Sequence, residues 1–88
     1  MTFRVRRLVG TPRVTLALSG ELNGDQLAEL GVIIEREKPD HVVLDLADVT
    51  LATREGIALI RRAVTEGAGL VNCPRYIRRW VDSGRDEA

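Results

Sequence analysis

The chain has 88 residues, enough for one small domain. Apolar residues make up 44% and charged residues 30%, which is typical of a folded chain and argues against disorder. Thirteen basic residues balance thirteen acidic ones, and this zero net charge argues against a partner such as nucleic acid or an anionic membrane.

Residues 3–9 and 13–20 are predicted to form two strands. Apolar and basic residues nearly alternate in the first, and Val14, Leu16 and Leu18 alternate in the second, as in strands with one solvated face. The intervening "GTP" at 10–12 is typical of a turn. An antiparallel hairpin is therefore expected.

The next segment, 23–38, is predicted to be a helix. Asn23 is expected to be its N-cap, with Gln26 completing a capping box, and Pro39 is expected to end it. Apolar residues recur at helical spacing: Leu27, Leu30, Ile33 and Ile34.

Residues 41–46, "HVVLDL", are rich in β-branched residues and indicate a strand covered on both faces. A second helix is expected from Thr53, its N-cap, to the "EGAG" segment at 66–69, and a short strand at 70–72 follows. A third helix is predicted to start at Pro74. Its apolar face is expected to comprise Tyr76, Ile77, Trp80 and Val81.

The order β-β-α-β-α-β-α predicts an α/β fold, a small mixed sheet with helices packed on it. Residues 1–82 are interpreted as a single domain and residues 83–88 as a polar tail. The lone cysteine, the absence of a secretory signal and the absence of an apolar run near the ~20 residues that span a bilayer all favour a soluble cytoplasmic protein.

Few residues suggest catalytic chemistry, so the chain is not expected to be an enzyme, and no metal or cofactor is expected. His41 is interpreted as a residue at a strand edge, and Cys73 as a small buried side chain in preference to an activated thiolate. Asp45 and Asp48 suggest a metal pair, but a backbone cap at Asp45 and a turn at Asp48 are favoured.

Arginines gather on the second and third predicted helices, where a patch for an acidic partner or RNA competes with an ordinary solvated face. They are Arg61, Arg62, Arg75, Arg78 and Arg79. The balanced charge and the scarcity of aromatic residues exclude nucleic acid as the favoured partner.

The segments "VTLALSGELNG" and "VVLDLADVTLATREGIALI", with a later "VN" before the third helix, resemble the STAS family of anti-sigma factor antagonists and sulfate-transporter tail domains. The resemblance covers about residues 13–82. It implies a non-catalytic, regulatory protein-binding module. Members usually continue with one more strand and helix, which this chain is expected to lack.

The family carries a D-S-S/T-G loop whose first serine accepts a regulatory phosphate. Aligned through Gly56, the corresponding residues are Thr53, Arg54 and Glu55, so the phosphate acceptor is replaced by an arginine. Control by serine phosphorylation is therefore not expected, and Thr53 is better explained as a helix cap.

By this resemblance, the partner-binding surface is expected on the loop and the outer face of the second helix. Its residues are Thr53, Arg54, Glu55, Ala58, Arg61 and Thr65. The expected partner is a protein, an anti-sigma factor or related regulator, or a second copy of the chain in a homodimer. A small-molecule sensor for nucleotides or lipids and a homodimeric scaffold subunit remain alternatives.

Overall fold

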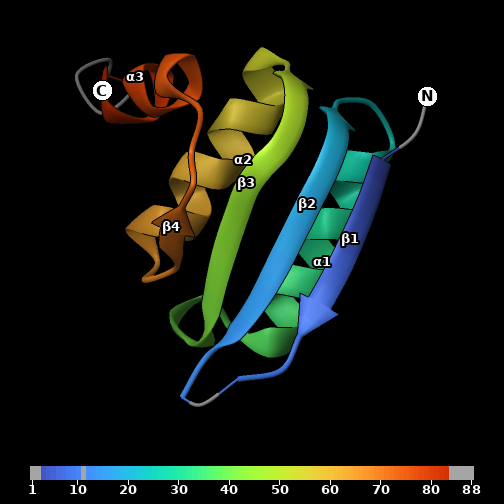
Figure 1. The fold of residues 1–88 in the computed structure, drawn as a ribbon, viewed down its shortest axis with the longest axis vertical. Helices are drawn as coiled ribbons and strands as arrows, with labels where there is room; N and C mark the ends of the chain where they lie inside the picture. The colour runs from blue at the N-terminus through green and yellow to red at the C-terminus, as the bar shows by residue number, and fades with distance from the viewer. Residues whose placement is uncertain (1–2, 11, 84–88) are drawn as a thin grey trace.

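The computed structural model describes residues 3–10 and 12–83. Figure 1 shows four strands and three main helices in the predicted order. The strands are β1 (Phe3–Leu8), β2 (Val14–Leu22), β3 (Val42–Ala52) and β4 (Gly69–Val71). The helices are α1 (Gln26–Glu37), α2 (Arg54–Thr65) and α3 (Arg75–Ser83), with a 3-10 turn, η1 (Pro39–His41), before β3.

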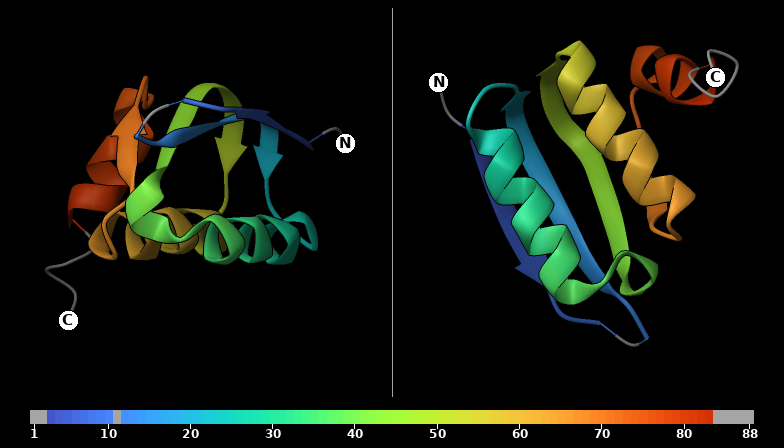
Figure 2. Two further views of the ribbon diagram at one scale, coloured as in Figure 1. Left: turned by 90° about the horizontal axis from the view of Figure 1, so that it is seen from below. Right: turned by 180° about the vertical axis from the view of Figure 1, so that it is seen from behind.

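The strands form one mixed sheet in the order β1-β2-β3-β4. The β1–β2 hairpin is antiparallel, whereas β2, β3 and β4 run parallel. The predicted α/β fold is therefore confirmed. Figure 2 shows that α1 and α2 cover one face of this sheet and that no described helix covers the other.

The hydrophobic core lies between the sheet and the helices. Strand alternation directs Leu16 and Leu18 of β2 and Leu44 and Leu46 of β3 toward the helix layer, where all four are almost fully buried. Ile60 of α2 is buried against them. Because every second strand residue points this way, the intervening residues occupy the uncovered face.

The central strand is longer than predicted. Residues 41–46 were expected as its extent, but β3 runs from Val42 to Ala52 and its pairing with β2 continues as far as Leu22 opposite Ala52. Two register shifts let the pairing continue where the residue counts of the two strands differ. As a result, Asp48 lies in the strand, and the turn expected there is wrong.

The predicted start of the first helix is also wrong. Strand β2 reaches Leu22, so Asn23 lies in the connection, where its side-chain amide donates a hydrogen bond to Glu21 at 3.2 Å. Asp25 occupies the N-cap position and its side chain makes no capping bond. The capping box of Asn23 and Gln26 is therefore not formed.

The third helix uses a narrower apolar stripe than predicted. Ile77 and Val81, one turn apart, are buried, whereas Tyr76 is 43% and Trp80 is 58% exposed. A nine-residue helix that approaches the core at one edge buries a single stripe, so assigning both aromatic residues to the core face was wrong. Ser83 is the last residue of α3, and the remainder of the predicted tail lies outside the described residues.

Candidate partner-binding surface

The connection between β3 and α2 consists of Thr53 alone, and its hydroxyl makes two hydrogen bonds. The Thr53 hydroxyl accepts a hydrogen bond from the Gly56 N–H at 3.2 Å and donates one to the Leu22 carbonyl at 3.1 Å. The Thr53 N–H also donates to that carbonyl. Thr53 is therefore the N-cap of α2, as predicted, and it ties the helix to the end of β2.

The other five predicted site residues lie on α2 and reach solvent to different degrees. Arg54, Glu55, Ala58 and Thr65 are exposed, and Arg61 is half-buried. The opposite side of the same helix is buried in the core through Ile57, Ile60 and Ala63. Among the described residues, the ion pairs are Arg7–Glu37 and Arg62–Glu66, so the Arg54 guanidinium has no carboxylate partner there.

A hollow of about 470 Å³ lies between α2 and α3. Three of the predicted residues, Ala58, Arg61 and Thr65, form its α2 side, and Val81 and Asp82 of α3 contribute to the other side. Thr53, Arg54 and Glu55 are at the N-terminal end of α2 and do not line it. The structure thus brings half of the predicted surface together with α3, a helix that the predicted partner-binding surface did not include.

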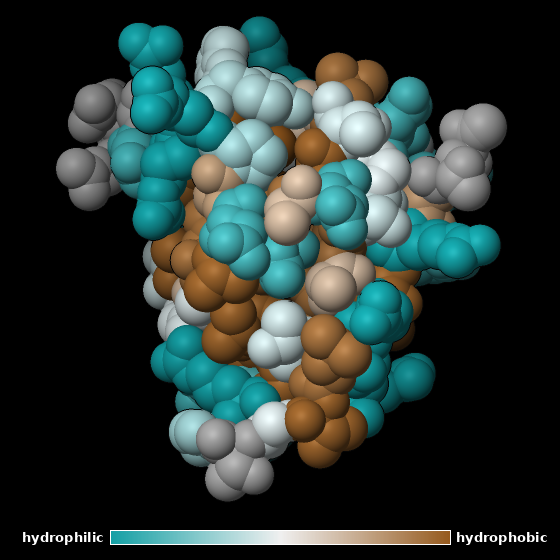
Figure 3. Space-filling view, in the orientation of Figure 1, coloured by the Kyte–Doolittle hydropathy of each residue, from teal (hydrophilic) through white to brown (hydrophobic). Residues whose placement is uncertain are grey.

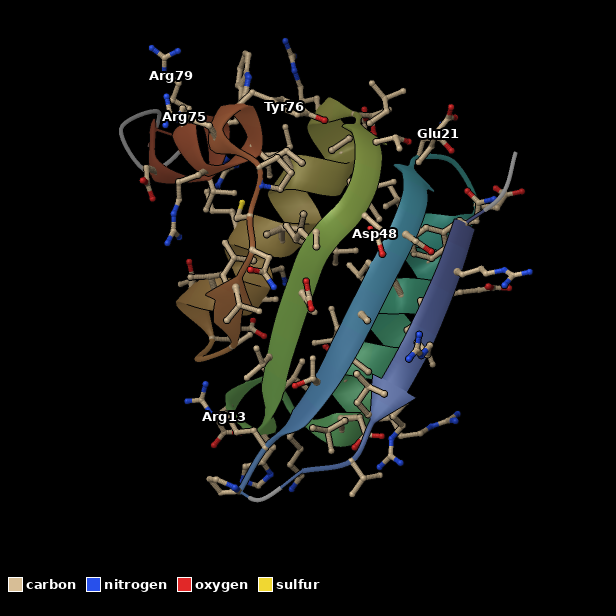
Figure 4. All side chains as sticks on the ribbon, viewed as in Figure 1. Arg13, Glu21, Asp48, Arg75, Tyr76 and Arg79 are labelled. Carbon is tan, nitrogen blue, oxygen red and sulfur yellow. The ribbon has the colours of Figure 1, made fainter. Side chains whose placement is uncertain are left out.

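The exposed side of α3 carries an aromatic and basic cluster, of which the sequence predicted the arginines as a candidate patch and missed the aromatic residues. Figure 4 shows Arg75, Tyr76 and Arg79 projecting from this helix at one end of the molecule. The Tyr76 hydroxyl donates to the Thr50 carbonyl at 3.5 Å, a long contact. The signal in the sequence was the group of three arginines in this helix, whereas the exposure of its two aromatic residues follows from the structure.

A second hollow, of about 600 Å³, runs between α1 and α2. Gly31 and Val32 line it from α1, and Leu59 lines it from α2. Gly31 leaves room at this crossing, since a Cβ there would come no nearer than 3.8 Å to the Leu59 side chain. None of the six predicted site residues lines this hollow.

The two aspartates of β3 have different environments. One Asp45 carboxylate oxygen accepts hydrogen bonds from the Ala47 N–H at 3.0 Å and the Asn72 amide at 3.2 Å, so its predicted role as a backbone cap is confirmed. Asp48 is exposed on the uncovered face of the sheet (Figure 4). Over residues 3–10 and 12–83, no three potential metal-ligating side chains gather in one place.

Cys73 and His41 lie in different surroundings. Cys73 is half-buried and, mainly because burial disfavours the thiolate, its pKa is raised above the usual value. Its thiol donates to the Pro74 carbonyl at 3.5 Å. His41 is exposed at the end of η1, beside the strand edge as expected.

The described helices include none with the length and apolarity needed to cross a membrane. The chain matches no protein-family model, and a search of curated proteins also finds no match. The fold and the surface together define a small α/β protein with a four-stranded mixed sheet, a helix layer on one face and an aromatic, basic helix at one end.

Proposed function

We propose that this protein is a non-catalytic regulatory module of the STAS type that binds a protein partner through α2 and α3. The observation that carries the proposal is the hollow between these helices, in which Ala58, Arg61 and Thr65 meet Val81. The hollow is lined by small and apolar side chains together with Arg61, the Arg62–Glu66 ion pair and Asp82, and a concave surface of this mixed kind suits insertion of a partner's side chains.

The charge of the surface indicates the chemistry of the partner. Arg54 is exposed, and Arg61 lies farther along the same side of α2. An acidic surface, as on an anti-sigma factor or a related regulator, would complement both guanidinium groups. Because arginine cannot be converted into a phosphate ester, binding at this position is expected to be constitutive and not switched by a kinase.

Thr53 is a poor substitute for the missing serine. Its hydroxyl already accepts a hydrogen bond from the Gly56 N–H and donates its proton to the Leu22 carbonyl. Adding a phosphate would break the cap and the link to β2. This supports a role for Thr53 in the structure of the site and not in its regulation.

The aromatic residues of α3 extend the proposed surface. Tyr76 and Trp80, flanked by Arg75 and Arg79, combine the residue types that contribute most to binding energy at protein interfaces. The single free cysteine suits the reducing cytoplasm, and we place the interaction there.

The test is quantitative affinity purification from the native host with the unmodified chain and with the Arg54→Glu and Arg61→Glu variants. A specific partner should be recovered with the unmodified chain and reduced at least about tenfold with either variant, because each reversal places like charges in the interface. Binding of the purified partner should also weaken as ionic strength rises.

Arg36→Glu is the matched control, because Arg36 is an exposed arginine on α1, outside the proposed surface. It should leave recovery unchanged. Equal recovery with all three variants, at unchanged thermal stability, would contradict the proposed surface. Phosphate found on Thr53 with a matching change in partner binding would contradict constitutive binding.

A further inference from the structure

The sheet face opposite the helices carries an ordered pattern of charge. In β1, Phe3 and Val5 pack against the core, so Arg4, Arg6 and Leu8 point to the uncovered face. In β2, Leu16 and Leu18 are buried toward the helices, so the small residues Thr15, Ala17 and Ser19 point outward, and Glu21 follows them near the end of the strand. Figure 3 views this face, on which apolar side chains are interspersed with polar ones.

The strand registers arrange the outward residues in three rows across β1, β2 and β3. Leu8, Thr15 and Val43 form the first row, Arg6, Ala17 and Asp45 the second, and Arg4, Ser19 and Asp48 the third. Basic residues thus lie on β1 and acidic residues on β3. The small, uncharged residues of β2 separate the two columns.

These charges are not neutralised within the described part of the chain. Its ion pairs involve neither Arg4 nor Arg6, and the Asp48 carboxylate makes no hydrogen bond or ion pair there. Among residues 3–10 and 12–83, the groups that donate to the Asp45 carboxylate are uncharged, the Ala47 N–H and the Asn72 amide. By contrast, Arg7, which points to the helix side, pairs with Glu37.

We propose that two copies of the chain associate face to face through β1, β2 and β3, about a two-fold axis that runs along β2. This rotation keeps each residue at its height along the strand and exchanges the β1 and β3 columns. Arg6 of one copy then faces Asp45 of the other, Arg4 faces Asp48, and Leu8 faces Val43. Each pair occurs twice because the interface is isologous.

The small residues of β2 suit a position on the axis. Ala17 and Ser19 of each copy would meet their own equivalents, and neither is large enough to hold the sheets apart. The rotation gives both sheets the same twist, so they could pack face to face in the aligned arrangement of sheet-on-sheet packing. The Arg13 side chain extends over Gly69 of β4, which is outside the three overlapping strands.

The dimer is expected to be weak. Three strands about 4.8 Å apart and about six residues long cover roughly 300 Å² of flat area. Stable complexes bury about 800 Å² per partner. Charge pairing at this face would therefore set the register of the two sheets and the specificity of the dimer more than its affinity. We expect a dimer dissociation constant in the micromolar range or weaker.

Sedimentation velocity of the purified chain up to about 1 mM protein is the first test. The second test uses the charge reversals Arg4→Asp and Asp48→Arg. Both residues are exposed, and neither side chain makes a hydrogen bond or ion pair within the described chain that the substitution would remove. Each variant alone should dimerise at least about tenfold more weakly, because its dimer contains two like-charge pairs. An equimolar mixture of the two variants should recover the dimer. In the mixed dimer both pairs between position 4 of one copy and position 48 of the other join opposite charges.

If circular dichroism shows that Arg4→Asp is poorly folded, Arg6→Asp replaces it as the single variant at a basic position. Its dimer would contain two like-charge pairs with Asp45. Glu35→Arg is the control, because it reverses a charge at an exposed position on α1, outside the proposed interface. This variant should dimerise like the unmodified chain. A monomer at every concentration, folded variants that dimerise normally, or a mixture that stays monomeric would each overturn the proposal. This face is separate from the α2 and α3 surface, so its failure would leave the proposed function intact.

Discussion

At the scale of single residues, two helical glycines have opposite surroundings. Gly56, in the first turn of α2, lies against the end of β2, where an added Cβ would approach the Leu22 carbonyl oxygen to 2.7 Å. Gly31, in α1, faces the hollow between α1 and α2, and an added Cβ would make only an ordinary van der Waals contact with Leu59. Gly56 therefore permits a close approach of backbones, whereas Gly31 only weakens its helix.

The substitution Gly56→Ala should destabilise the protein by about 1–3 kcal/mol, because backbone and not a flexible side chain must move to admit the methyl group. The substitution Gly31→Ala should stabilise it by up to about 1 kcal/mol through helix propensity. Urea denaturation of both variants measures the difference. Equal effects of the two substitutions would contradict the assigned role of Gly56.

At the scale of elements, one ion pair joins the edge strand to the first helix. Arg7 of β1 donates through its guanidinium to both carboxylate oxygens of Glu37, the last residue of α1. These hydrogen bonds lower the pKa of Glu37 and raise that of Arg7. Because the pKa of Glu37 is lower in the folded chain, the pair stabilises the fold above the unfolded pKa, and this contribution is lost as the pH falls through the folded pKa.

The Glu37→Gln variant should therefore melt at a lower temperature than the unmodified chain at pH 7, and this gap should close as the pH falls below the ordinary glutamate pKa of about 4.3. The pair is solvated, so the gap should be small. Melting curves between pH 7 and pH 3 measure it. Glu35→Gln is the control, and a gap for Glu37→Gln that stays constant with pH would contradict the linkage.

At the scale of the whole molecule, stability depends on one thin core. Its centre is aliphatic, and Leu44, the third residue of β3, is fully buried between β2, β4 and the helices. A chain of this size has a total stability of only about 5–15 kcal/mol. Leu51, at the other end of the same strand, is 46% exposed and contributes little to this core.

Leu44→Ala should cost about 2–5 kcal/mol and leave a substantial unfolded fraction, whereas Leu51→Ala should change stability little. Urea denaturation followed by circular dichroism compares the two. A similar loss for both would indicate that the core is not centred on the first half of β3.

The sequence by itself determined the element order, the mixed α/β class and the capping role of Thr53. Each of these depends on short-range chemistry: the alternation of apolar residues in β2, the helical spacing of apolar residues in α2, and the Thr53 hydroxyl beside a first-turn N–H of α2 that has no partner within the helix. The same local reasoning failed for Asn23 and for the length of β3. In both places, continued pairing between β2 and β3 extends the strands past the point where local signals end them.

Tertiary structure alone decided which surfaces are available. The spacing of Tyr76, Ile77, Trp80 and Val81 does not reveal that α3 touches the core along one stripe only, because that depends on where α2 lies. Nor does the sequence reveal that Arg6 and Asp45 share a row across β2, since long-range strand register sets that placement. Local periodicity specifies what each segment becomes, and packing between distant segments determines which side chains remain free to bind.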